Sequence, residues 1–165
     1  MLTVQTYLAP SNIHGIGLFA AEDLPRGTVI WRFNPNIDKV ITRKKFIRMC
    51  REVDFCTLKH LLNATYKRRG KFFYITDNAR FINHSEEGCN VALIDDHTEI
   101  SIRDIRAAEE LLENYNASYD ANDFFFLECM QNQNQYVEWM ETLGRCAPET
   151  VSFRPCGGFA KATGR

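Results

Sequence analysis

The sequence predicts a single α+β domain that is rich in β-structure. Short runs of β-branched and aromatic residues alternate with turn residues along most of the chain, and one longer stretch of helical periodicity interrupts them. The 165 residues, 45% of them hydrophobic, suffice for one buried core that needs neither disulfides nor a structural metal. Many short strands with few helices favour small sheets over a doubly wound parallel sheet.

Three short strands are expected near the N-terminus, over residues 3–8, 16–20 and 28–33. The second follows Gly15-Ile16-Gly17 and the third follows Pro25-Arg26-Gly27, both of which favour turns. A Rossmann-type dinucleotide turn would open a helix after its glycines. The strand-like Leu18-Phe19-Ala20 therefore argues against that type of site.

A helical segment is predicted over residues 42–66. Apolar side chains recur there at the spacing of a helix face, and Thr42 is a suitable N-cap. The segment forms either one helix or two short helices that break near residues 54–57.

Three more strands and a C-terminal helix are predicted in the second half of the chain. The strands cover 72–75, 90–94 and 98–102, and the turn Asp95-Asp96-His97 joins the last two as a hairpin. A helical flank over 121–143 completes a single domain of residues 1–143, and residues 144–165 form a partly flexible tail.

The charge balance disfavours a nucleic acid as partner. Twenty Lys and Arg against 21 Asp and Glu give a formal net charge of −1, which supplies no strong attractive field. The basic run 67–71 is either a solvated turn beside a strand or a local contact surface for an acidic partner. We expect no direct nucleic-acid binding.

The six cysteines lack the close pairs that structural zinc or a redox dithiol requires. We therefore expect no metal and reduced thiols in a cytoplasmic protein, with Cys89, Cys146 and Cys156 as an alternative metal set. No stretch approaches the roughly 18 apolar residues of a membrane span, and the first residues do not resemble an export signal. The sequence does not specify an oligomeric state.

Three motifs, in this order, carry the functional interpretation. The first is the segment 11–30, which contains Gly15-Ile16-Gly17-Leu18-Phe19-Ala20. The second is the segment 78–85, which ends in Arg80-Phe81-Ile82-Asn83-His84-Ser85, with Asn90 beyond it. The third is the segment 102–115, which ends in Glu109-Glu110-Leu111-Leu112-Glu113-Asn114-Tyr115. Together the motifs resemble the SET-domain family of protein lysine methyltransferases, over residues 11–120.

The resemblance implies small curved sheets of the β-clip type, through which the chain threads a pseudoknot, with residues 42–66 as the helical insert. It also implies transfer of a methyl group from S-adenosylmethionine to a lysine of a protein, with a histone as one candidate substrate. The expected location is the cytoplasm or, for a histone substrate, the host nucleus. Tyr115 is then catalytic and Phe33, Tyr74 and Tyr119 are channel candidates. The residues expected around the cofactor are His14, Gly15, Ile16, Gly17, Arg80, Phe81, Asn83, His84 and Tyr115.

Physical reasoning supports these roles but leaves alternatives open. Gly15 and Gly17 either let the backbone approach the cofactor or form a tight turn. Asn83 and His84 need hydrogen-bond partners in an apolar segment, which the cofactor or the turn itself supplies. Arg80 pairs either with the cofactor carboxylate or with an internal acid, and Tyr115 is alternatively a core aromatic.

The chain departs from the family's pattern at several points. Glu113 replaces an aromatic residue two places before Tyr115, so the degree of methylation is open and the carboxylate could favour a cationic peptide. The family's cysteine-rich C-terminal zinc knot is missing, as expected of a compact, stand-alone protein. A desolvated channel lowers the lysine pKa, so we expect no dedicated general base, neither Glu113 nor Asp104. The alternative function is a catalytically silent module that binds a peptide or cofactor.

Overall fold

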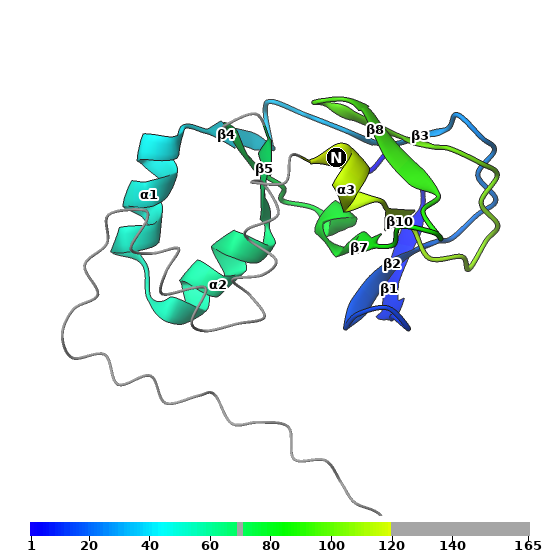
Figure 1. Cartoon of the computed structure of the whole chain (residues 1–165), viewed down its shortest axis with the longest axis horizontal. Coiled ribbons are helices and arrows are strands. Elements are labelled where there is room, and N and C mark those ends of the chain that lie inside the picture. Colours follow the sequence, from blue (N-terminus) through cyan, green and yellow to red (C-terminus); the bar gives the residue numbers. More distant parts are fainter. Residues whose placement is uncertain (69–70, 120–165) are drawn as a thin grey trace, which may run out of the picture.

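The computed structural model describes residues 1–68 and 71–119, and all structural statements below refer to this part of the chain. Its centre is a five-stranded sheet in the order β3-β9-β8-β10-β7. The strands are β3 (Val29–Arg32), β7 (Asn83–His84), β8 (Val91–Asp95), β9 (Thr98–Ser101) and β10 (Leu112–Glu113). In the described residues this sheet combines with two smaller ones (Figure 1).

The chain threads through itself where β10 enters this sheet. β10 runs parallel to both β7 and β8 and lies between them, while residues 85–90 connect β7 to β8 around it. Asn90 fastens this crossing, because its buried amide donates to the Glu110 carbonyl (2.7 Å) and its Oδ1 accepts from the Leu112 N–H (2.8 Å). The predicted class, β-rich α+β with a pseudoknot, is confirmed.

A hairpin of β1 (Thr6–Pro10) and β2 (Ile16–Ala20) forms the second sheet. Its loop, residues 11–15, turns at Gly15, whose φ of +54° lies in the left-handed region that favours glycine. Leu18 and Ala20 of β2 are fully buried, so one face of this hairpin closes the core.

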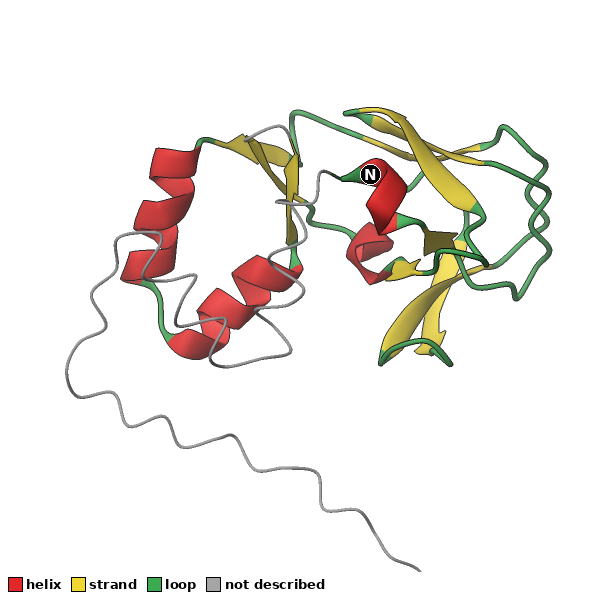
Figure 2. Ribbon diagram, in the orientation of Figure 1, coloured by secondary structure: helices red, strands yellow, loops and turns green. Residues whose placement is uncertain are grey.

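The helical insert and the third sheet lie together at one end of the molecule (Figure 2). α1 (Arg43–Glu52) and α2 (Phe55–Asn63) precede β5 (Thr65–Arg68), which pairs with β6 (Lys71–Tyr74), and β6 pairs with β4 (Lys39–Ile41). Thr42 caps α1 as predicted, by accepting from the Lys45 N–H. Asp54 caps α2 in the same way, and its extended backbone breaks the helix at the predicted place.

Two short helical turns complete the described elements. The 3-10 helix η1 (Asn78–Phe81) precedes β7, and α3 (Tyr115–Ser118) follows β10. The core beneath them consists of aliphatic and aromatic side chains from β2, β3, β6, β8 and the segments next to β10, with Leu18, Ile30, Ile105 and Leu111 almost completely inaccessible.

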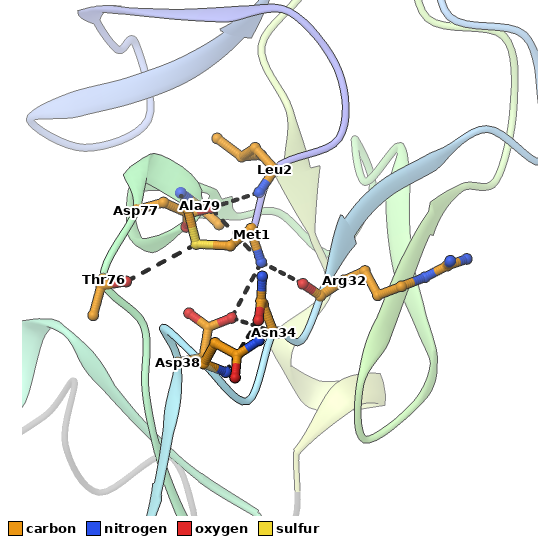
Figure 3. A network of polar contacts seen from close by, with 9 residues as sticks. Met1, Leu2, Arg32, Asn34, Asp38, Thr76, Asp77 and Ala79 are labelled. Atoms are coloured by element: carbon orange, nitrogen blue, oxygen red, sulfur yellow. Dashed lines mark hydrogen bonds and ion pairs between the residues drawn. The ribbon is translucent and has the colours of Figure 1, made fainter.

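A polar network joins the first residues to two distant segments (Figure 3). The Met1 amine donates to the Arg32 carbonyl and to the buried Asp38 carboxylate, and the Leu2 N–H donates to Asp77 at 2.5 Å. Asp77 also caps η1. The network therefore holds η1, and with it the start of β7, against β3.

The predicted strands and helices are largely found, with shifted bounds. The strand predicted at 3–8 begins at Thr6, and Thr65 and Tyr66, expected in the helical segment, belong to β5. The predicted hairpin of 90–102 is confirmed as β8–β9. Residues 121–165, with the predicted flank and tail, lie outside the described residues. No helix in residues 1–68 and 71–119 is long and apolar enough to cross a membrane.

Candidate functional site

Asn83 brings the first and second motifs together. Its side-chain amide donates to the carbonyls of His14 (3.1 Å) and Ile16 (3.2 Å), and to Glu110 Oε1 (2.9 Å). Residues that are 67 and 69 positions apart in the chain thus meet at one amide group. Since the amide nitrogen is occupied by the protein, only Oδ1 of Asn83 is left to accept from a ligand.

Glu110 connects the third motif to the first two and accounts for the absence of a side chain at Gly17. The Glu110 carboxylate also accepts from the Ser11 hydroxyl at 3.0 Å. A Cβ built on Gly17 would lie 2.1 Å from Glu110 Oε1, so any other residue at this position would displace the carboxylate. The close approach that we expected at Gly17 is therefore made by a side chain of the protein itself.

Asn83→Asp tests this three-acceptor environment. The introduced carboxylate would face two carbonyls and Glu110, so its pKa in the folded protein should rise above the unfolded value. Stability relative to wild type should then be nearly retained at acidic pH and lost as the pH rises through the raised pKa, by about 3 kcal/mol at neutral pH. Urea unfolding of both proteins across pH 4–8 measures the difference. In the exposed control, Asn36→Asp, the difference should stay near zero, and equal behaviour of the two variants would contradict the geometry.

Tyr115 lies directly against His84. The Tyr115 N–H donates to His84 Nδ1 at 3.1 Å, and the two ring centroids are 5.2 Å apart. Because Nδ1 accepts, the proton of the neutral imidazole is on Nε2, which faces away from this bond. The predicted pair of Asn83 and His84 therefore contacts residues 14–17, the glycine loop, through one side chain and Tyr115 through the other.

The Tyr115 side chain is buried, and its hydroxyl donates to the Ile82 carbonyl at 2.5 Å. Burial, followed by the negative charges of Glu113 and Glu99, raises the pKa of Tyr115 well above its ordinary value. The hydroxyl hence keeps its proton at physiological pH and directs it at a backbone carbonyl. Its oxygen lone pairs are then the groups that a cationic or methyl-bearing ligand would meet.

Tyr115 belongs to an aromatic cluster with Tyr119 and Tyr66. Tyr119 packs edge-on against Tyr115 with centroids 5.6 Å apart, and Tyr66 stacks on Tyr119 at 5.7 Å. The Arg68 guanidinium lies 5.1 Å from the Tyr119 ring centroid. Flat aromatic walls of this kind suit an aliphatic chain that ends in a cation.

A small cavity of about 30 Å³ lies beside this aromatic cluster. Glu99 and Glu113 line it, and both side chains are buried, while Arg68 and Asp96 form an ion pair at 3.7 Å on its wall. Burial raises the pKa of Glu99 and of Glu113, and the negative charge of Glu113 raises that of Glu99 further. The remaining lining residues are Trp31, Tyr66, Phe73, Ile75, Ala79, Ile82, Leu93 and Tyr119.

The other predicted site residues lie either in or near the glycine loop, as Arg80, Phe81, His14 and Ile16 do, or away from it, as Phe33 and Tyr74 do. Arg80 and Phe81 lie on η1 with the guanidinium 4.9 Å from the Phe81 ring, and Arg80 has no carboxylate partner among residues 1–68 and 71–119. His14, in the loop of the β1–β2 hairpin, and Ile16, the first residue of β2, are exposed. Phe33 instead packs against Trp31, Phe73 and His97. Tyr74 is next to Phe73 in β6, and alternation along the strand directs it away from the cavity that Phe73 lines.

Sequence reasoning missed Glu110, Glu99 and Tyr66 as parts of this region. Glu110 is one of two adjacent glutamates in the third motif, and nothing local distinguishes the one that faces Asn83. Around β9 the alternation of Ile100 and Ile102 with polar residues predicts that the isoleucine face is buried, whereas the structure buries the face of Glu99 and Ser101, so the pattern pointed away from Glu99. Tyr66 was hidden by the helical interpretation of 42–66.

Comparisons with known proteins agree with this architecture. No curated protein sequence is similar enough to count as a match. Similar solved structures include the Chaetomium thermophilum polycomb repressive complex 2, with 23% identity, a TM-score of 0.53, and 72% of this chain and 16% of that chain covered. The structure of ctPRC2 bound to S-adenosylmethionine has 22% identity and a TM-score of 0.54, with 80% of this chain and 17% of that chain covered. The structure of ctPRC2 with H3K27me3 and H3K27M has 24% identity and a TM-score of 0.51, with 68% of this chain and 14% of that chain covered.

These structures share the fold, and the chain spans less than a fifth of the length of the chains it matches. The model of the SET domain family matches residues 15–116, which is more than half of the sequence and includes the second and third motifs and most of the first. With its threaded β10 and the convergence of those motifs, the chain belongs to the SET domain family.

Proposed function

We propose that this protein transfers a methyl group from S-adenosylmethionine to the ε-amine of a lysine in a protein substrate. The observation that carries the proposal is the convergence of the glycine loop, Asn83-His84 and Tyr115 on one place, through hydrogen bonds of Asn83 and His84. Methyl transfer requires the reacting atoms to be held nearly in line, so catalysis is chiefly positioning. The cofactor supplies the activated methyl group when it is bound.

The residues around the glycine loop fit S-adenosylmethionine chemically. The half-buried Arg80 guanidinium has no acidic partner among the described residues, which favours a ligand carboxylate over an internal acid. Asn83 Oδ1 can accept from the ligand's ammonium group, and the 50% exposed Ile16 offers an apolar surface to its adenine. We therefore assign the cofactor to the space bordered by residues 14–17, 80–84 and Tyr115.

The substrate lysine is assigned to the aromatic cluster. Tyr115 and Tyr119 would enclose its aliphatic stem, and the Tyr115 oxygen, whose proton points at Ile82, would accept a hydrogen bond from its nitrogen. We keep Phe33 and Tyr74 as channel residues of lower priority, since their recorded contacts lie elsewhere. One of the similar structures is a complex with H3K27me3, so histone H3 is the first substrate to try.

The test uses the full chain with isotopically labelled S-adenosylmethionine. Calorimetry should show binding of the cofactor, and labelling of a proteome and of a histone set, side by side, should give at least one labelled protein whose label maps to lysine. Cofactor binding without any labelled protein would favour the silent binding module. Absence of cofactor binding would refute the methyl-transfer function and leave only a silent module that binds a peptide.

A further inference from the structure

Four buried polar atoms from four strands belong to residues that line the cavity beside the aromatic cluster. Trp31 Nε1 comes from β3, Arg68 Nε from β5, Glu99 Oε2 from β9 and Glu113 Oε1 from β10. None of the four has a hydrogen-bond partner among residues 1–68 and 71–119. Buried polar groups without partners are rare and destabilise a folded protein, so four around one small cavity call for a shared ligand.

The chemistry of the four atoms identifies this ligand. Trp31 Nε1 and Arg68 Nε carry protons and can only donate, whereas the two carboxylate oxygens accept. The ligand must therefore accept two hydrogen bonds and donate two, which a water molecule does and which neither an ammonium nor an anion can do. A volume of about 30 Å³ has room for one or two waters, by the size a single water requires.

The cavity is also close to the proposed reaction site. Tyr119 lines it and packs against Tyr115, and its hydroxyl is 3.4 Å from Glu113 Oε2. Ile82 lines the cavity as well, and its backbone carbonyl accepts the hydrogen bond from the Tyr115 hydroxyl. A proton released beside Tyr115 would thus be one side chain away from a buried carboxylate.

We propose that this cavity binds water held jointly by Trp31, Arg68, Glu99 and Glu113, and that Glu113 receives through it the proton that the substrate lysine must lose. This inference rests on the proposed function. It differs from our sequence-based expectation that no side chain serves as a base. That expectation came from the desolvation of the channel, which lowers the pKa of the lysine.

The proton balance is simple. One N–H bond of the substrate ammonium breaks and its electron pair stays on nitrogen, while the proton passes to water and a water proton forms an O–H bond on the Glu113 carboxylate. The carboxyl later releases the proton to solvent. At neutral pH only about one free lysine in 2,500 is deprotonated, so a nearby proton acceptor would greatly increase the fraction of reactive amine.

Glu113 is surrounded by groups of both signs. Because Glu99 and Glu113 are close and buried, they favour holding one proton between them, which leaves one carboxylate able to accept another. Burial raises the pKa of Glu113, which brings it nearer to that of the lysine. The titratable and charged groups around the pair are Arg68, Asp77, Asp96, the Met1 amine and the phenols of Tyr66, Tyr115 and Tyr119.

The first test is the pH dependence of kcat/KM with a lysine peptide labelled by the wild type. We expect a wild-type profile that is nearly flat from pH 7 to 9, because the acceptor is already ionised. Glu113→Gln should instead rise about tenfold per pH unit over this range, as the fraction of free amine does. The control is Glu52→Gln, which removes an exposed carboxylate on α1 (66% exposed) and should keep the wild-type profile.

The shape of the profile, and not the absolute rate, separates proton acceptance from a structural role. A wild-type profile that itself rises tenfold per pH unit would overturn the proposal even if Glu113→Gln fails to fold, as would identical shapes for wild type and Glu113→Gln. Cofactor binding with no labelled protein at any pH would instead overturn the proposed function.

The second readout needs no activity. A crystal structure at a resolution that shows ordered waters should place one within about 2.7–3.2 Å of Glu113 Oε1 and of the other three atoms. Glu113→Gln should keep this water, since the amide oxygen can still accept. A dry cavity in the wild type would overturn the proposed water site and the proton path through it.

Discussion

Replacement of Tyr115 by phenylalanine should lower methyl transfer by at least about 100-fold and leave binding of S-adenosylmethionine nearly unchanged. The phenol is the group that would hold the lysine nitrogen, and removal of one preorganised hydrogen-bonding group from an active site typically lowers kcat by about 10²–10³. The ring remains, so its contacts with His84 and Tyr119 should persist. Transfer is measured by single-turnover labelling, and cofactor affinity by calorimetry.

The stability of this variant also has an expected value. The Ile82 carbonyl loses its donor, which should lower the free energy of unfolding by about 1 kcal/mol, too little to unfold the protein. Tyr7→Phe is the matched control, since Tyr7 is 41% exposed on β1 and stacks on Phe19 away from Tyr115. Its labelling should equal that of the wild type. Equal labelling by Tyr115→Phe would remove Tyr115 from the proposed mechanism.

Replacement of Gly17 by alanine should damage both stability and cofactor binding. The added methyl group would overlap the Glu110 carboxylate, at 2.1 Å from Oε1, so Glu110 has to move. Its movement breaks the hydrogen bonds from Asn83 and Ser11 that hold the glycine loop. We expect a loss of about 1–3 kcal/mol in the free energy of unfolding, as for other overpacked sites, and a cofactor affinity at least about tenfold weaker.

Gly27→Ala separates the loss of stability from the loss of the site. Gly27 has a φ of +88° in open space, so alanine there is strained by about 1–2 kcal/mol without a clash. This control should be destabilised to a similar extent and should bind S-adenosylmethionine like the wild type. Urea unfolding and calorimetry at a temperature where all three proteins are folded give both quantities. Unchanged affinity in Gly17→Ala would show that Glu110 does not position the loop.

The local elements were the predictable ones. The β8–β9 hairpin and the caps Thr42 and Asp54 depend on residues within a few positions of each other, so their signals are complete in short stretches of sequence. The strands β4, β7 and β10 are only two or three residues long and carry no periodic pattern. Their hydrogen bonds come from strands elsewhere in the chain, which is why the sequence did not reveal them.

The family resemblance, the β-rich class and the residues around which the site is proposed can be read from the amino-acid sequence, because motif residues are recognisable one segment at a time. The partners of these residues depend on the folded arrangement. Asn83 meets the glycine loop and Glu110, Glu110 occupies the space beside Gly17, and Glu113 shares a cavity with Glu99 and Arg68. The physical reason is that burial and hydrogen bonding depend on distances in space, and the threading of β10 between β7 and β8 sets those distances for residues far apart in the chain.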